Sequence, residues 1–147
     1  MKFLHVLRSF TFAILLSAPC FAHHMAVVVA NANPNADITS KHLARIFKME
    51  LRKWPDGKDV IVVLHKNSNG EMITLERLGK MSLGEMNSVV ATHKDAIRFV
   101  ASDADMLKEV EATPGAVGLV DFRSVDGHVK VVKVDGKFPS EEGYLPH

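Results

Sequence analysis

Apolar runs bounded by turn-forming residues predict the strands of this chain. Residues 25–30 (MAVVVA) are rich in β-branched side chains and precede a loop with three asparagines and a proline. Residues 59–65 (DVIVVLH) and 116–122 (AVGLVDF) contain nearly unbroken apolar runs, a pattern typical of strands covered on both faces. Residues 129–134 (VKVVKV) alternate only partly, which predicts a strand nearer the sheet edge.

Three- and four-residue spacing of apolar positions predicts the helices. Thr39 can cap a helix that runs to about residue 49, because Leu43, Ile46 and Phe47 fall on one face. Three more helices are predicted, over residues 71–80, over residues 83–100, and from Ser102 or Asp103 through Val110. Residues 137–147 show no apolar period and are predicted to be irregular.

The order of these elements predicts the fold class. Strands that alternate with helices form βαβ units, so we expect an α/β fold with a largely parallel sheet flanked by helices. Residues 23–147 have the usual size of one domain with one core.

The first 22 residues have the composition of a secretory signal. Lys2 and Arg8 precede an apolar run over residues 10–16, and small residues follow up to Ala22. We expect cleavage after Ala22 and export to the periplasm. The alternatives are a buried N-terminal helix and a lipoprotein anchored through Cys20, although the proline directly before Cys20 does not suit that processing.

Removal of this segment changes the charge and the cysteine count. The whole chain has 18 Lys and Arg, 17 Asp and Glu and one cysteine; without Lys2, Arg8 and Cys20, 16 basic residues remain against 17 acidic ones. The domain then has a net charge of −1 and no thiol. Such a balance gives no electrostatic footprint for nucleic acid. No other apolar stretch reaches membrane-spanning length, so we expect no membrane span in the mature protein.

Motifs for catalysis or metal binding do not occur in the sequence. GxSxG and P-loop patterns are missing, and no HExxH spacing occurs among the histidines. His23 and His24 at the mature terminus can in principle ligate Cu²⁺ or Ni²⁺, but a frayed terminus usually does not. We therefore predict no enzyme activity, no catalytic residue, no metal site and no cofactor. The scattered lysines are interpreted as solvated, namely Lys41, Lys48, Lys53 and Lys66.

Four segments in this order resemble a known family. They are residues 38–47 (ITSKHLARIF), 54–57 (WPDG), 78–82 (LGKMS) and 113–120 (TPGAVGLV). Together they resemble the second lobe of the periplasmic phosphate-binding proteins of ABC importers, and more closely the short single-lobe relatives of those proteins. The resemblance implies a single lobe of a type II periplasmic-binding-protein-like fold over residues 23–147. It also implies transport of phosphate or another oxyanion, with an ABC permease as a partner.

The candidate anion site is the loop after the strand over residues 59–65. Ligands of open α/β sheets lie beyond the carboxyl ends of strands, where helix N-termini offer unpaired amides. We expect the anion contacts there, at His65, Lys66, Asn67, Ser68, Asn69 and Gly70. In the family that the chain resembles, this loop carries a Ser-Gly-Thr type element with an arginine nearby.

Glu71 departs from that pattern. Ser68 and Glu71 have the spacing of a capping box, in which Ser68 accepts from the Glu71 amide while the Glu71 carboxylate reaches back. A carboxylate at this place repels an anion, and the resemblance leaves out the first lobe that completes the family's phosphate cage. Two functions therefore stay open: a periplasmic solute-binding-like protein for phosphate or a related oxyanion, and an envelope protein-interaction module that has lost ligand binding.

Overall fold

The computed structural model describes residues 24–146, and the segment expected to be a signal lies outside these residues. Its centre is a five-stranded sheet with the order β4-β3-β5-β1-β6. The strands are β1 (Met25–Ala30), β3 (Ile61–His65), β4 (Ile97–Val100), β5 (Ala116–Asp121) and β6 (Val129–Val131). A separate two-stranded parallel sheet joins β2 (Asp37–Ile38) to β7 (Lys133–Val134).

Strand directions confirm the largely parallel sheet. β3 pairs in parallel with β4 on one side and with β5 on the other. β1 is antiparallel to both β5 and β6, so it alone among the five runs against the others. The two strands that the sequence predicts as buried, β3 and β5, are direct neighbours.

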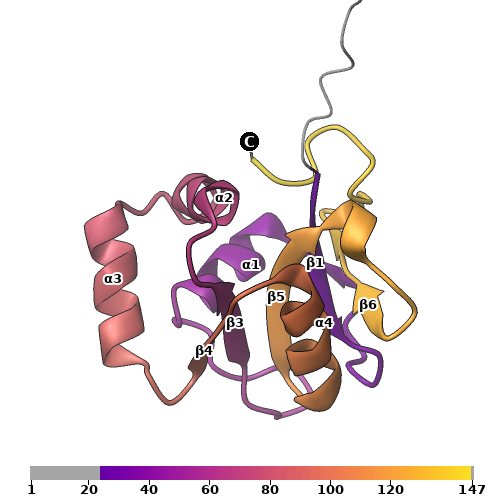
Figure 1. Cartoon of the computed structure of the whole chain (residues 1–147), viewed down its shortest axis with the longest axis horizontal. Coiled ribbons are helices and arrows are strands. Elements are labelled where there is room, and N and C mark those ends of the chain that lie inside the picture. Colours follow the sequence, from indigo (N-terminus) through magenta and orange to yellow (C-terminus); the bar gives the residue numbers. More distant parts are fainter. Residues whose placement is uncertain (1–23, 147) are drawn as a thin grey trace, which may run out of the picture.

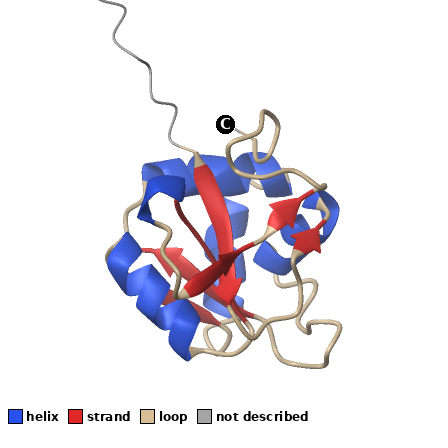
Figure 2. Cartoon of the chain, turned by 90° about the vertical axis from the view of Figure 1, so that its right-hand side faces the viewer, coloured by secondary structure: helices blue, strands red, loops and turns tan. Residues whose placement is uncertain are grey.

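Helices cover both faces of the sheet (Figures 1 and 2). On one face α1 (Ser40–Phe47), α2 (Asn69–Gly79) and α3 (Leu83–Thr92) contribute to the larger apolar cluster. On the other face α4 (Asp103–Ala112) packs with Met106 and Val110 against β3 and β5. Gly118 in β5 makes this close packing possible, because a side chain there would collide with Met106. The arrangement is the expected α/β fold.

The prediction of one helix over residues 83–100 is wrong. The helix ends at Thr92, and Ile97–Val100 forms the edge strand β4 beside β3. This segment shows no alternation of buried and exposed positions, since Ile97 is buried while Arg98 and Phe99 are both exposed, and pairing with β3 decides its structure.

The predicted strand over residues 129–134 is split into two. β6 pairs with β1 in the main sheet, while β7 pairs with β2 in the small one. The Val132 amide still donates to Val27 O, and the chain then leaves the main sheet. The C-terminal tail is irregular as predicted, yet Tyr144 is buried and its hydroxyl bridges Val27 N and Val132 O.

Candidate functional site

The junction between β3 and α2 places the predicted site residues at the carboxyl end of a central strand. β3 ends at His65, the chain turns through Asn67 with φ at 113°, and Ser68 caps α2. The Ser68 hydroxyl accepts a hydrogen bond from the Glu71 amide at 3.2 Å. This part of the predicted capping box is confirmed.

The prediction that the Glu71 carboxylate reaches back to its own helix cap is wrong, because the carboxylate turns toward the end of β3. Glu71 Oε2 accepts a hydrogen bond from the His65 amide at 2.8 Å. The Glu71 side chain is buried, with about 1% of its surface exposed. The last amide of β3 is therefore satisfied by a carboxylate of the same chain, which lies inside the junction.

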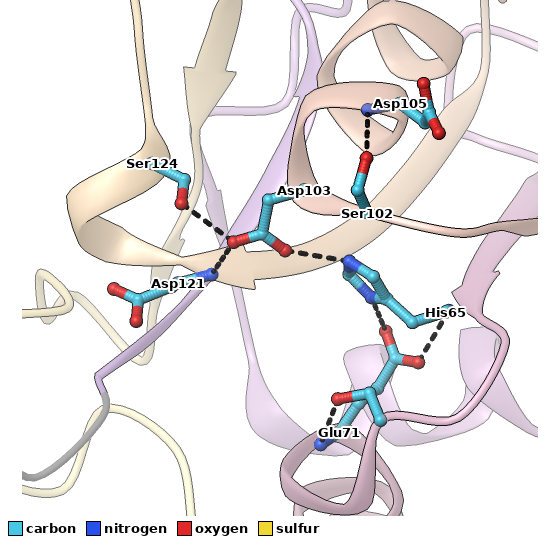
Figure 3. A network of polar contacts seen from close by, with 8 residues as sticks. His65, Glu71, Ser102, Asp103, Asp105, Asp121 and Ser124 are labelled. Atoms are coloured by element: carbon cyan, nitrogen blue, oxygen red, sulfur yellow. Dashed lines mark hydrogen bonds and ion pairs between the residues drawn. The ribbon is translucent and has the colours of Figure 1, made fainter.

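His65 links this carboxylate to a second one (Figure 3). Its Nδ1 lies 3.0 Å from Glu71 Oε1, and its Nε2 lies 2.7 Å from Asp103 Oδ1. The other oxygen of Asp103 accepts from the Asp121 amide at 3.1 Å and from the Ser124 hydroxyl at 2.8 Å. The network ties α2, α4 and the end of β5 to the end of β3.

Both contacts of the imidazole require a proton. A neutral imidazole donates from one nitrogen only, so either His65 is an imidazolium or one of the two carboxyl groups carries a proton. The hydrogen bond to Glu71 and the nearby charges of Glu71 and Asp103 raise the pKa of His65 above its usual range. Burial raises the pKa of Glu71. Both directions favour a retained proton, and the cluster of these three residues then carries one net negative charge.

The structure brings four of the six predicted residues together around a small hollow. His65, Lys66, Asn67 and Ser68 line a cavity of about 200 Å³ with Ala101. Asn69 and Gly70 do not line this cavity and are exposed in the first turn of α2. Within residues 24–146, no acceptor receives a hydrogen bond from the backbone amide of Asn69 or of Gly70.

Two residues of the network were missed by the sequence analysis. Asp103 and Ser124 lie 38 and 59 positions beyond His65 and carry no motif. A reading of residues 97–100 as a strand beside β3 would have placed the start of α4 near His65, because parallel strands end at the same edge.

The interpretation of the lysines as scattered is also wrong in part. Lys41 and Lys48 lie around one hollow with Arg45 and Lys80. Lys53 instead pairs with Asp59 at 2.7 Å.

Within the described residues no group of three His, Cys, Asp or Glu side chains could hold a metal ion. Across 24–146 there is also no helix with the length and apolarity to cross a membrane.

The fold is similar to solved phosphate-binding proteins. An ABC-type phosphate transport receptor from Vibrio cholerae matches with a TM-score of 0.66 and 24% identity, over 80% of this chain and 48% of the receptor. A phosphate ABC transporter substrate-binding protein with bound phosphate from Clostridium perfringens matches with 0.66 and 21% identity, over 79% and 46%. PstS from Borrelia burgdorferi matches with 0.60 and 17%, over 80% and 49%.

These similarities define the class of fold. The chain has the fold of a single lobe of a periplasmic phosphate-binding protein, and the resemblance of its sequence segments is confirmed at that level. It spans about half the length of the solved proteins that it matches. No protein-family model matches the sequence, and no curated protein matches it.

Proposed function

We propose that this protein is an envelope interaction module built on a phosphate-binding-protein lobe, with Glu71 in the place of the anion. The main support for this proposal is the buried Glu71 carboxylate, which accepts a hydrogen bond from the His65 amide and lies beside the His65 ring. These are the donors that an anion at the end of β3 would use. The proposal follows the interaction alternative and not the solute-binding one.

The charges of the junction support this choice. Glu71 and Asp103 both lie within hydrogen-bond distance of the His65 ring, at 3.0 and 2.7 Å. A phosphate about 5 Å from one carboxylate is repelled by roughly 3 to 7 kcal/mol at an effective dielectric constant near 20, depending on its charge. Since a micromolar ligand binds with about 8 kcal/mol, this repulsion removes between about two fifths and four fifths of that binding free energy.

Oxyanion binding at the outer rim of the junction is the second candidate. It is favoured by the exposed amides of Asn69 and Gly70, which have no acceptor among residues 24–146. Lys66 is exposed beside them and makes no ion pair within the same residues. A phosphate held there would stay in solvent and would bind weakly.

The proposed place of action is the bacterial envelope. The sequence of residues 1–22 supports export and cleavage after Ala22, and the solved proteins of similar fold are named as receptors of phosphate ABC transporters. A non-enzymatic role agrees with these neighbours, which are binding proteins.

Thermal unfolding of the exported form, residues 23–147, separates the two candidates. We expect millimolar phosphate and sulfate to give no larger shift of the melting temperature than chloride at equal ionic strength. A ligand at 100 times its dissociation constant would add about 2.7 kcal/mol, a shift of several degrees. A selective phosphate shift in the wild-type protein overturns the interaction proposal, and a selective shift smaller than this supports the weak rim site.

The variant Glu71→Thr tests whether Glu71 is the cause. It removes the carboxylate and gives the sequence Ser-Asn-Gly-Thr, which is closer to the Ser-Gly-Thr type of element that the resembling family carries. We expect a phosphate-dependent shift to appear in this variant. The matched control Glu76→Thr changes the net charge equally, farther along the same helix, and should show no phosphate response. An equal response of both variants contradicts the role of Glu71.

A further inference from the structure

A second hollow lies between α1 and the C-terminal end of α2. Its volume is about 470 Å³, and four cationic side chains line it with a single carboxylate, Glu50. The cations are Lys41 and Arg45 of α1, Lys48 at the C-cap of α1 and Lys80 at the C-cap of α2. Ala44, Leu78 and Gly79 form the less polar part of its lining. We call this hollow the basic groove.

The positive charge of the basic groove is only partly compensated. Glu50 lies 3.9 Å from both Arg45 Nε and Lys48 Nζ, and 53% of its side chain is exposed. Lys41 and Lys80 make no ion pair within residues 24–146. The nearby Glu85 carboxylate is engaged by its own helix cap, and the Ser82 amide and hydroxyl, with a weaker effect of Lys48, lower its pKa. The groove thus keeps a surplus of positive charge.

The helix dipole explains the position of some of these cations but not that of Lys41. Arg45 and Lys48 lie at the C-terminal end of α1, where the helix dipole favours positive charge. Lys41, however, lies in the first turn, where the dipole disfavours it, and one turn before the like charge of Arg45.

Lys80 is a second feature that the fold does not require. Its φ is 50°, a left-handed conformation at a helix end that favours glycine. Gly79, one position earlier, has a helical conformation and does not use this freedom. The chain therefore holds a lysine in a costly conformation at the rim of the groove.

We propose that the basic groove docks an acidic segment of a partner protein, with an apolar side chain between its carboxylates. This inference rests on the proposed function as an interaction module. The cations of α1 extend over seven residues, about 10 Å of helix, which is too far for one phosphate to reach from end to end. In an extended segment every second side chain lies on the same face, so an acidic, an apolar and an acidic residue at positions i, i+2 and i+4 face the groove together, with the two carboxylates about 13 Å apart, which is enough to reach both ends of this stretch. The less polar lining accepts the intervening side chain.

The test uses a blocked peptide of glutamates and leucines, measured by calorimetry or fluorescence polarisation. We expect saturable binding that weakens with salt, and no binding of the matched peptide with glutamine for glutamate. Inorganic tripolyphosphate is a further arm. Binding of tripolyphosphate without binding of the peptide overturns the proposal in favour of a small polyanion site.

Two variants and a control locate the site. Arg45→Glu should weaken peptide binding at least about tenfold. Lys108→Glu makes the same charge change on α4, on the opposite face of the sheet, and should change affinity less than about twofold. Equal weakening by both variants would mean non-specific attraction and would overturn the proposal.

Lys80→Gly separates docking from stability. Glycine suits the left-handed conformation, so the melting temperature should rise by about 2–5 °C while peptide affinity falls. A rise in melting temperature with unchanged affinity contradicts a docking role for Lys80. None of these measurements uses orthophosphate or a variant of Glu71, so failure here leaves the result for the β3–α2 junction standing, and the reverse also holds.

Discussion

The two ends of α2 carry opposite electrostatic situations. At its N-terminal end, where the dipole favours an anion, the third residue of the helix supplies one, and Glu71 is fully buried against His65. At its C-terminal end, Lys80 faces Lys41 and Arg45 of α1 with one exposed carboxylate among them. At the N-terminal end, the chain's own carboxylate already occupies the place of an anion. At the C-terminal end, positive charge remains that an external anion would neutralise.

Removal of Glu71 is the strongest way to test this difference. Glu71→Ala leaves the His65 amide and ring without their acceptor inside the junction. We expect a loss of about 3 kcal/mol in the free energy of unfolding, measured by denaturant titration.

Glu71→Gln is the matched control, since its amide oxygen can still accept from the His65 amide. It should cost clearly less than Glu71→Ala. If both variants unfold as readily as each other, or if Glu71→Ala costs under about 1 kcal/mol, the carboxylate does not complete the junction.

The pH dependence of stability gives the next largest effect. The pKa of His65 is raised in the folded protein, chiefly by its hydrogen bond to Glu71. The stability from the protonated ring is therefore complete below the unfolded pKa near 6.5 and is lost as pH rises through the folded pKa. The raised pKa of Glu71 acts in the same direction.

Melting curves at a series of pH values above 6.5 should show this loss in the wild-type protein. His65→Asn should flatten the profile. The exposed His128, which lies 3.1 Å from Glu111, serves as control, and His128→Asn should leave the profile unchanged. A flat wild-type profile would mean that the cluster holds no additional proton.

The smallest expected change in the free energy of unfolding comes from a substitution in the basic groove, and this substitution should stabilise the protein. Lys41→Glu places an acidic residue in the first turn of α1 and replaces a like-charge neighbour of Arg45 by an opposite one. We expect the free energy of unfolding to rise by about 0.5 kcal/mol at low salt. A destabilised Lys41→Glu variant would show that the lysine serves the fold, which would weaken the comparison between the two ends of α2.

Sequence patterns predicted most of the fold for physical reasons that can be named. Buried neighbours β3 and β5 lack a polar face, and the caps Thr39, Ser68 and Ser102 each accept a hydrogen bond from an amide three residues later. β4 was missed because four residues of an edge strand are too few to outweigh a preceding helical pattern.

The candidate site was predicted less completely because it depends on contacts between distant segments. The position of the junction and the Ser68 cap follow from local spacing. The turn of Glu71 toward His65, and the approach of Asp103, follow from the packing of α2 and α4 against the end of β3. Local spacing likewise says nothing of Lys80 meeting Lys41, since α1 and α2 are joined through β3.

The most direct measurement is a phosphate titration of the ¹⁵N-labelled protein, followed at the amides of His65, Asn69 and Gly70. With Glu71 in the place of the anion, the wild-type protein should show no saturable shift at these amides at millimolar phosphate, whereas Glu71→Thr should show one. Saturation of the wild-type His65 and Gly70 amides at submillimolar phosphate would contradict the account.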